Sequence, residues 1–372
     1  MNHKYKKYFD KKSAHRHWPI NGNYTNKTYD FIISIPCYDE YDYLFKTISS
    51  IQKQNNELLK NTLISIVINN SDTENQQIID NNAKTFKKLL EYKSDLEFIV
   101  IDAFSKKNSI NDKDAGVGTA RKISVDVTLP YCKSDTIICF IDADTKLSED
   151  YLDVIHASYM KNQWKAATVD FEHLRDEPET IKIISNYENF LKSTAKNLKK
   201  SNSPYSYVPL GSTMICTQNA YIAVGGMNKR KAAEDFYFLQ ELQKSFGVFH
   251  INNILVYPSS RHLNRSYLGT SMRLKKCVDG KLDINSLYYS SKSFKILSIW
   301  IEIALNSQKI SYEEMLKKCQ KIDLDLSEIL IKLNFKKAWE GITNSSSNIH
   351  FKKQFHRWFD AFKTFKLLKY YS

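Results

Sequence analysis

The feature that most constrains this fold is a regular alternation of short apolar runs and helical patterns over residues 31–141. Four runs rich in β-branched residues each end in a polar turn, and apolar residues at helical spacing follow the first three. The predicted strands are residues 31–35, 63–68, 96–101 and 136–141. Strands that alternate with helices form a mainly parallel sheet, so we expect an α/β fold whose ligands gather at the carboxyl ends of the strands.

The rest of the chain divides into a less regular stretch and a helical end. Residues 166–171 and 214–217 are predicted strands, and residues 179–198 and 236–245 are predicted helices. Beyond about residue 269 the glycines thin out and helical patterns dominate. The predicted organisation is a flexible lead-in (1–30), an α/β catalytic domain (31–269) and a helical C-terminal extension (270–372).

Composition limits the class of protein without choosing a function. A chain of 372 residues can bury a full core and suits one large domain with an appendage. Its net charge of +13 favours an anionic partner, which could be a nucleic acid, an acidic membrane surface or a phosphorylated substrate. The six cysteines are scattered without a C-x-x-C pair, so we expect neither a zinc site nor disulfides, and a cytoplasmic setting. No apolar stretch approaches the roughly 20 residues that a membrane span needs.

The sharpest local feature is a pair of acids, Asp142 and Asp144, directly after the fourth predicted strand. Two carboxylates at a strand end offer the hard oxygen ligands that a divalent cation prefers. A cation there could act as a Lewis acid that neutralises a diphosphate leaving group. An ordinary strand-end turn would explain the same residues, because acids are common in turns.

Five ordered segments resemble the family 2 glycosyltransferases with the GT-A fold, over residues 31 to about 270. The segments are residues 34–40 (SIPCYDE), 66–71 (IVINNS), 116–122 (GVGTARK), 140–144 (FIDAD), and 225–227 (GGM) followed by 233–236 (AEDF). They are similar to the family's P-x-Y-N-E turn, V-V-D-D-G-S segment, G-x-x-x-A-R-N helix start, D-x-D strand end, and G-G-F and E-D segments. One departure is Asn69-Asn70, which replaces the usual acidic pair, although amides can also recognise a nucleobase edge.

The resemblance implies a Rossmann-like sandwich that transfers a sugar from a nucleotide donor, most simply a UDP-sugar, with Mg²⁺ or Mn²⁺. The acceptor would be the hydroxyl of a glycan or lipid-linked saccharide, as in polysaccharide biosynthesis, and the outcome would be inverting. Asp144 would bind the metal directly, with Asp142 in its shell or on the ribose, and His262 as a further ligand. The resemblance places these residues around the nucleotide sugar: Pro36, Tyr38, Glu40, Asn70, Arg121 and Asp142.

The acid pair Glu234-Asp235 is the expected catalytic segment, and by resemblance Asp235 is the base that deprotonates the acceptor. A carboxylate can do this when it lies within hydrogen-bond reach of the hydroxyl. Helix capping is the structural alternative, because acids at a helix start interact favourably with its dipole. Arg261, next to His262, could clamp phosphate oxygens, although an ordinary surface loop explains it nearly as well.

The C-terminal segment combines aromatic residues at helical spacing with basic residues. The aromatic residues are Phe351, Phe355, Trp358, Phe359, Phe362 and Phe365. Such a helix can lie peripherally on an anionic membrane, which suits a lipid-linked acceptor, or its aromatic stripe can dock on the catalytic domain.

Two other functions fit parts of the sequence. Nucleotidyl transfer also uses α/β domains, acids and metals, but residues 36–40 contain no glycine of the kind that a phosphate-cradling loop needs. A non-enzymatic nucleic-acid binder would account for the charge and the aromatic tail, yet it has no need of the three acids Asp142, Asp144 and Asp235. We therefore expect no nucleic-acid partner.

Overall fold

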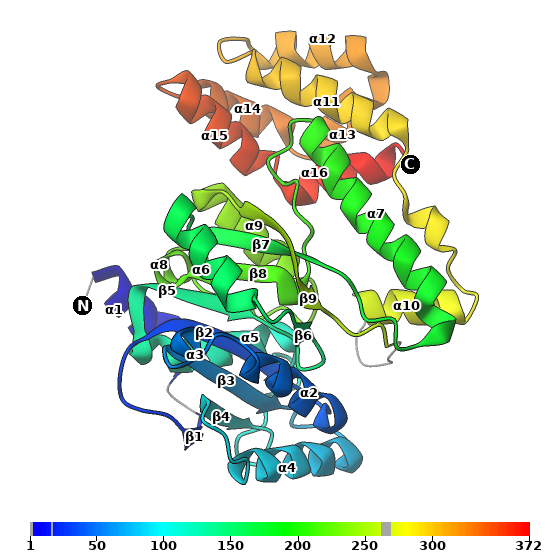
Figure 1. Cartoon of the computed structure of the whole chain (residues 1–372). Coiled ribbons are helices and arrows are strands. Elements are labelled where there is room, and N and C mark those ends of the chain that lie inside the picture. The colour runs from blue at the N-terminus through cyan, green and yellow to red at the C-terminus, as the bar shows by residue number, and fades with distance from the viewer. Residues whose placement is uncertain (1–2, 16–17, 262–268) are drawn as a thin grey trace. The chain divides into compact units, whose positions relative to one another are not determined.

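The computed structural model describes residues 3–15, 18–261 and 269–372 (Figure 1). The chain forms two compact units. The first, here called the α/β unit, comprises Met1–Ile184 and Pro209–Asp279. The second, the helical unit, comprises Ser185–Val208 and Gly280–Ser372.

Nine strands in the described part of the α/β unit form one sheet, in the order β1-β4-β3-β2-β5-β8-β7-β9-β6. Their bounds are β1 Ile20–Asn23, β2 Tyr29–Cys37, β3 Thr62–Asn69, β4 Glu97–Ala103, β5 Cys132–Phe140, β6 Lys146–Leu147, β7 Ala166–Phe171, β8 Met214–Thr217 and β9 Phe249–Tyr257. β2, β3, β4 and β5 pair in parallel. β8 is antiparallel to both β5 and β7, and β9 is parallel to β7, so β7 and β9 run in the same direction as β5. The sheet is therefore mainly parallel, as the sequence predicted.

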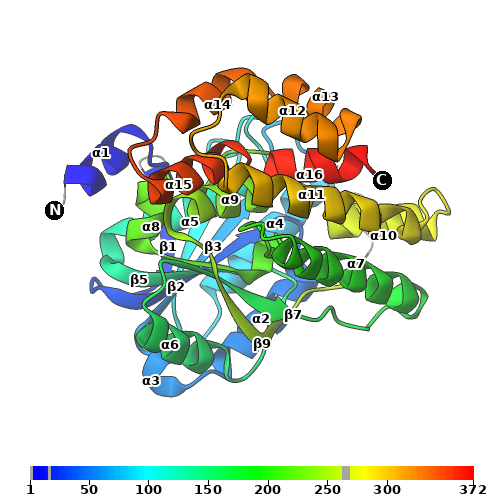
Figure 2. The same cartoon turned by 90° about the horizontal axis from the view of Figure 1, so that it is seen from above.

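Helices cover both faces of this sheet, and their bounds are α1 His3–Lys11, α2 Tyr41–Gln52, α3 Asn56–Leu59, α4 Gln76–Leu90, α5 Val117–Thr128, α6 Tyr151–Asn162, α8 Gln218–Ala223, α9 Glu234–Phe246 and α10 Thr270–Val278. Contacts join α5, α8 and α9 on one face, and Figure 2 shows α2 and α6 on the other. Each of the eight residues of β3 is buried, which explains why this strand is a continuous β-branched run rather than an alternating one.

Within residues 3–15 and 18–30 the structure describes helix α1 and strand β1, which contact the rest of the α/β unit, whereas the sequence predicted a flexible lead-in. Tyr8 on α1 is 3% exposed, and its hydroxyl donates a 2.7 Å hydrogen bond to the buried carboxylate of Asp126. The backbone N–H of Ala14 donates to the other oxygen of Asp126 at 2.7 Å, and β1 pairs antiparallel with β4. The segment is held by polar contacts to a distant buried acid, and a hydrophobic pattern cannot reveal such contacts.

The helical unit has its own core. Its elements are the part of α7 (Ile181–Lys200) from residue 185, α11 Ser291–Leu305, α12 Tyr312–Ile322, α13 Leu324–Lys332, α14 Phe335–Thr343, α15 Asn348–Trp358 and α16 Ala361–Tyr370. Trp300, Trp339 and Phe335 are fully buried at its centre. The division differs from the predicted boundary at residue 270, because most of α7 belongs to the helical unit and α10 belongs to the α/β unit.

Part of the C-terminal aromatic stripe lies in the core of the helical unit, whereas Phe362 is exposed. Phe351, Phe355 and Phe359 are at most 1% exposed within that core. The aromatic pattern does not form a single helix but is divided between α15 and α16. The division falls at Asp360, whose side chain accepts a hydrogen bond from the Lys363 backbone N–H and caps α16. No helix in the described ranges is long and apolar enough to cross a bilayer.

Candidate functional site

The site is built where the chain changes direction along the sheet. From β2 the chain moves outward through β3 and β4, and then crosses back to add β5 on the other side of β2. Ligands of open α/β sheets bind at the carboxyl ends of strands at such a switch point. Residues 38–40 follow β2, and Asp142 and Asp144 follow β5, so these side chains meet at that edge.

Arg261 joins the two strand ends. It follows β9, which runs in the same direction as β5 and so ends at the same edge. Its Nη2 donates to Asp144 Oδ2 at 2.5 Å and to Glu40 Oε2 at 2.8 Å, and its guanidinium lies 3.4 Å from the ring centroid of Tyr43. Burial disfavours the charge on Arg261, but Asp144 and Glu40 more than offset this and raise its pKa.

A second arginine, Arg121 on α5, collects acids from distant parts of the chain. Its Nη2 donates to Asp142 after β5, its Nη1 donates to Glu234 at the start of α9, and its side chain is 2% exposed. Burial raises the pKa values of Asp142, Glu234 and Asp235, and Arg121 opposes these shifts. The structure thus brings together the predicted residues Arg121, Asp142, Glu234 and Asp235.

Asp235 is the second residue of α9, where its charge interacts favourably with the helix dipole, but the helix has no side-chain cap. Its Oδ1 accepts a 2.7 Å hydrogen bond from the backbone N–H of Phe236, in the first turn of α9. A carboxylate has two oxygens, so this bond leaves capacity for a second partner. The bond from the Phe236 N–H and a role as base are compatible.

Three glycines allow these segments to approach. A Cβ on Gly118 would lie 2.5 Å from the Asn228 carbonyl oxygen and 3.0 Å from the Glu234 Cβ, so its absence lets the loop before α9 pack on the start of α5. A Cβ on Gly116 would lie 2.6 Å from the Lys231 Cα. Across the site, a Cβ on Gly211 would lie 2.1 Å from Arg121 Nη2. Small residues therefore set the position of the arginine and of the acid pair.

The two expected metal ligands, Asp142 and Asp144, each accept a hydrogen bond from an arginine, Arg121 and Arg261 respectively. Arg121 faces three acids, so the cluster has more negative than positive charge, and Asp144 further raises the pKa of Asp142. Asp142 and Asp144 supply hard oxygen ligands. No group of three or more Asp, Glu, His or Cys residues that could hold a metal is found within residues 3–15, 18–261 and 269–372. The third expected ligand, His262, lies outside the described residues.

Two predicted nucleotide contacts, Tyr38 and Asn70, are engaged with the protein itself. Asn70 is 1% exposed, and its amide nitrogen donates to the carbonyl oxygens of Ser71 and Phe104 at 2.8 and 3.2 Å. Its Oδ1 accepts from Asn82 at 3.0 Å, so the amide has a structural role. The Tyr38 hydroxyl donates to Glu74 at 2.8 Å, and Pro36 is half-buried within β2.

Sequence reasoning missed a small cavity beside Asp144 and Arg261. It has a volume of about 150 Å³, and Tyr43, Lys46 and Lys146 contribute to its lining. Tyr43 and Lys46 stand on α2, one and two turns after Glu40, and Lys146 is two residues after Asp144. Their short distance along the chain from Glu40 and Asp144 was the signal that could have predicted a place at the site.

No protein-family model matches the chain, and no protein in a collection of curated sequences matches it. Among solved structures, the chain is similar to residues 1–349 of S. aureus TarS, with 12% identity, a TM-score of 0.43, and coverage of 88% of this chain and 90% of that one. It is also similar to the same protein in complex with UDP-GlcNAc, with 13% identity, a TM-score of 0.45 and coverage of 88% and 91%. A third is the mannosyltransferase PcManGT from Pyrobaculum calidifontis in complex with GDP-Man and Mn²⁺, with 10% identity, a TM-score of 0.43 and coverage of 95% and 93%. TM-scores below 0.5 are too low to assign this chain a family or a function.

Proposed function

We propose that the α/β unit is a glycosyltransferase of the family 2 type, which transfers a sugar from a UDP-sugar to the hydroxyl of a glycan or lipid-linked saccharide. One observation carries the proposal. Acids from the end of β5 and the start of α9 converge on the buried guanidinium of Arg121, at the switch point of a mainly parallel sheet. An edge where acids meet in this way would suit a cation-binding pair and a base, which supports the proposal.

Asp144 and Asp142 would hold Mg²⁺ or Mn²⁺, which when bound supplies Lewis-acid stabilisation of a departing diphosphate. Arg261 contacts Asp144 and Glu40, and its guanidinium has the planar donors that bind phosphate oxygens in pairs. Arg121 fixes Asp142 and Glu234 in place through two hydrogen bonds. These contacts hold the acids before any substrate arrives, and such preorganisation lowers the barrier to reaction.

Asp235 would take the proton of the acceptor hydroxyl while the oxygen attacks the sugar in a single displacement, with inversion. Its bond to the Phe236 N–H fixes the carboxylate at the first turn of α9. Burial raises the pKa of Asp235 and the nearby guanidinium of Arg121 opposes this, so the side chain is more basic than an exposed aspartate and suited to accept a proton.

A screen of UDP-, GDP- and dTDP-sugars for metal-dependent thermal stabilisation and hydrolysis tests the proposal. A ligand at about 100 times its Kd stabilises the folded state by about 2.7 kcal/mol, so a hit raises the unfolding temperature and names the nucleotide. Asp235→Asn should keep this stabilisation and lose about 10²- to 10⁴-fold in transfer rate. Glu241→Gln, an exposed change on the same helix, is the matched control. Transfer at the wild-type rate by Asp235→Asn would exclude its role as base, and no stabilisation by any nucleotide sugar would remove the proposal.

A further inference from the structure

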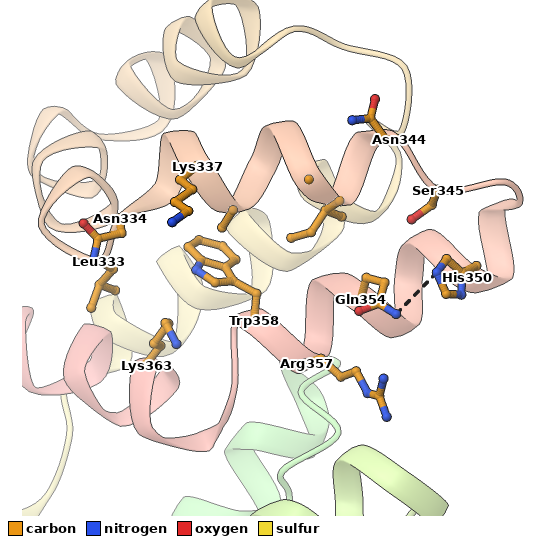
Figure 3. Close-up of a pocket in the computed structure, with 13 residues that line it drawn as sticks. Leu333, Asn334, Lys337, Asn344, Ser345, His350, Gln354, Arg357, Trp358 and Lys363 are labelled. Atoms are coloured by element: carbon orange, nitrogen blue, oxygen red, sulfur yellow. Dashed lines mark hydrogen bonds between the residues drawn. The ribbon is translucent and has the colours of Figure 1, made fainter.

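The helical unit contains a cavity of about 690 Å³, and all of its lining residues belong to that unit. The end of α13 and the three helices α14, α15 and α16 form its walls, and Figure 3 shows its lining residues. Small-molecule sites in proteins have volumes of about 300–1,000 Å³, so the cavity is large enough for a compact ligand.

The lining is basic. Lys337 on α14, Arg357 on α15 and Lys363 on α16 all contribute to it, and no acidic residue from the described ranges lines the cavity. Lys363 lies 3.6 Å from Asp360, whereas neither Lys337 nor Arg357 has an ion-pair partner in the part of the chain that the structure describes. The three helices α14, α15 and α16 thus each contribute one basic residue to the lining.

An aromatic ring lies among these charges. Figure 3 shows the Trp358 indole between Lys337 and Lys363. Phe335 stacks on the indole at a centroid distance of 5.4 Å and an interplanar angle of 28°, which fixes the ring in the core of the unit while Trp358 still lines the cavity. The negative face of an aromatic ring attracts the partly positive hydrogens of a ligand's C–H groups, so the indole provides a flat apolar surface.

Side-chain amides complete the lining. Asn334 lies at the start of α14, and Gln354 lies on α15, where its Nε2 is 3.3 Å from His350 Nε2. An amide can both donate and accept hydrogen bonds, which matches the hydroxyl groups of a sugar. Cationic groups, a flat apolar ring and amides together match a ligand that carries an anionic group on a polyhydroxylated ring.

We propose that this cavity binds a phosphorylated sugar, with the C–H face of the sugar ring on Trp358 and the phosphate at Lys337 and Lys363, which lie on either side of the indole in Figure 3. The charges line one concave site around a single aromatic ring, whereas single-stranded nucleic acid needs a groove with successive stacking platforms. The proposal depends on the helical unit alone and stands whether or not the α/β unit transfers sugars.

The test is a calorimetric titration of the full chain with glucose 6-phosphate, glucose and inorganic phosphate at one ionic strength. The variant Lys337→Gln/Lys363→Gln removes two lining charges. Its matched control, Lys336→Gln/Lys366→Gln, removes the same charge from the same two helices at positions outside the cavity, where the lysines lie over Tyr312 and Phe362. Thermal unfolding of both variants confirms that they are folded.

We expect glucose 6-phosphate to bind the wild type and the control double variant alike, and to bind Lys337→Gln/Lys363→Gln at least tenfold more weakly. Trp358→Phe should also weaken binding, and nucleotide-sugar binding by the α/β unit should be unchanged in each variant. If both double variants bound glucose 6-phosphate equally weakly, the loss of binding would come from the change in overall charge, and the proposal would be overturned. So would no binding to the wild type, inorganic phosphate binding as tightly as glucose 6-phosphate, or a single-stranded RNA oligonucleotide competing more tightly for the same lysines.

Discussion

Arg121 is the residue on which the arrangement of the candidate site depends. Its guanidinium is buried and faces Asp142, Glu234 and Asp235, so the loss of this one cation would leave the buried carboxylate of Glu234 and the partly exposed carboxylate of Asp142 without their arginine partner. Breaking a buried ion pair by removing one partner costs about 3–5 kcal/mol. The same residue fixes the geometry of acids that come from β5 and α9, so stability and site geometry rest on one side chain.

Gly211→Ala should disturb this geometry without changing any charge. The new Cβ would meet the Arg121 guanidinium at 2.1 Å, and a buried arginine held by two acids cannot move freely. We expect destabilisation by about 1–3 kcal/mol, the usual cost of overpacking, and weaker nucleotide-sugar binding. Chemical denaturation and calorimetry measure the two effects.

Gly341→Ala is the control for this change. Gly341 is exposed within α14, and a Cβ there would meet nothing within 4 Å, so the substitution should be neutral or stabilise by about 0.5–1 kcal/mol. If Gly211→Ala has the stability and binding of the wild type, Arg121 is not held against Gly211 as described.

At this scale the sequence predicted Asp142 and Asp144 from their place directly after a strand, and Arg121 and Asp235 through the resemblance to family 2 glycosyltransferases. It could not predict that Asn70 is engaged in the structure, since its partner Asn82 is 12 residues away on α4 and carries no pattern of its own. The bond between Arg261 and Glu40 joins residues 221 positions apart, and no local spacing contains that information.

The elements of the α/β unit differ in how clearly the sequence shows them. β2, β3, β4 and β5 are buried runs of β-branched residues and were predicted. β9 was missed because it reads FHINNILVY, with two asparagines at its centre and register shifts against β7. Its alternation is therefore interrupted, although it places Arg261 at the site. β6 has two residues, too few for any periodicity.

In the helical unit, α15 and α16 show how one pattern supports several interpretations. Aromatic residues at helical spacing predict an apolar face, and only the tertiary structure decides what covers it. Here part of the face lies in the unit's own core, where Phe355 contacts Trp300 at a centroid distance of 5.7 Å, and Phe362 is exposed.

Phe355→Ala should therefore destabilise the helical unit by about 3–5 kcal/mol, the cost of deleting a large buried side chain. Phe362→Ala, on α16 and 41% exposed, should change stability by less than about 0.5 kcal/mol. Denaturant unfolding followed by tryptophan fluorescence is suitable, because Trp300, Trp339 and Trp358 all lie in this unit. If both substitutions had equal and small effects, the aromatic face would not be core.

At the scale of the whole molecule, the net charge of the chain is positive, at +13, whereas acidic residues outnumber basic residues at the candidate site around Arg121 and Arg261. A positive protein field draws in an anionic nucleotide sugar. Close to Asp142 and Asp144, however, a diphosphate meets negative charge, and a divalent cation between them removes this repulsion. The net charge of the chain and the local charge of the site together predict that a nucleotide-sugar donor binds only with a metal ion.

A calorimetric titration with UDP, in Mn²⁺ and in excess chelator, tests this claim most directly. The proteins are the wild type, Asp144→Asn, and Asp150→Asn as a control at an exposed residue whose side chain makes no capping bond. We predict that the wild type and Asp150→Asn bind UDP at least tenfold more tightly with Mn²⁺ than with chelator, and that Asp144→Asn binds weakly in both. If UDP bound the wild type equally well with and without metal, or bound Asp144→Asn as tightly as the wild type, the acids at the sheet edge would not hold a cation for the diphosphate.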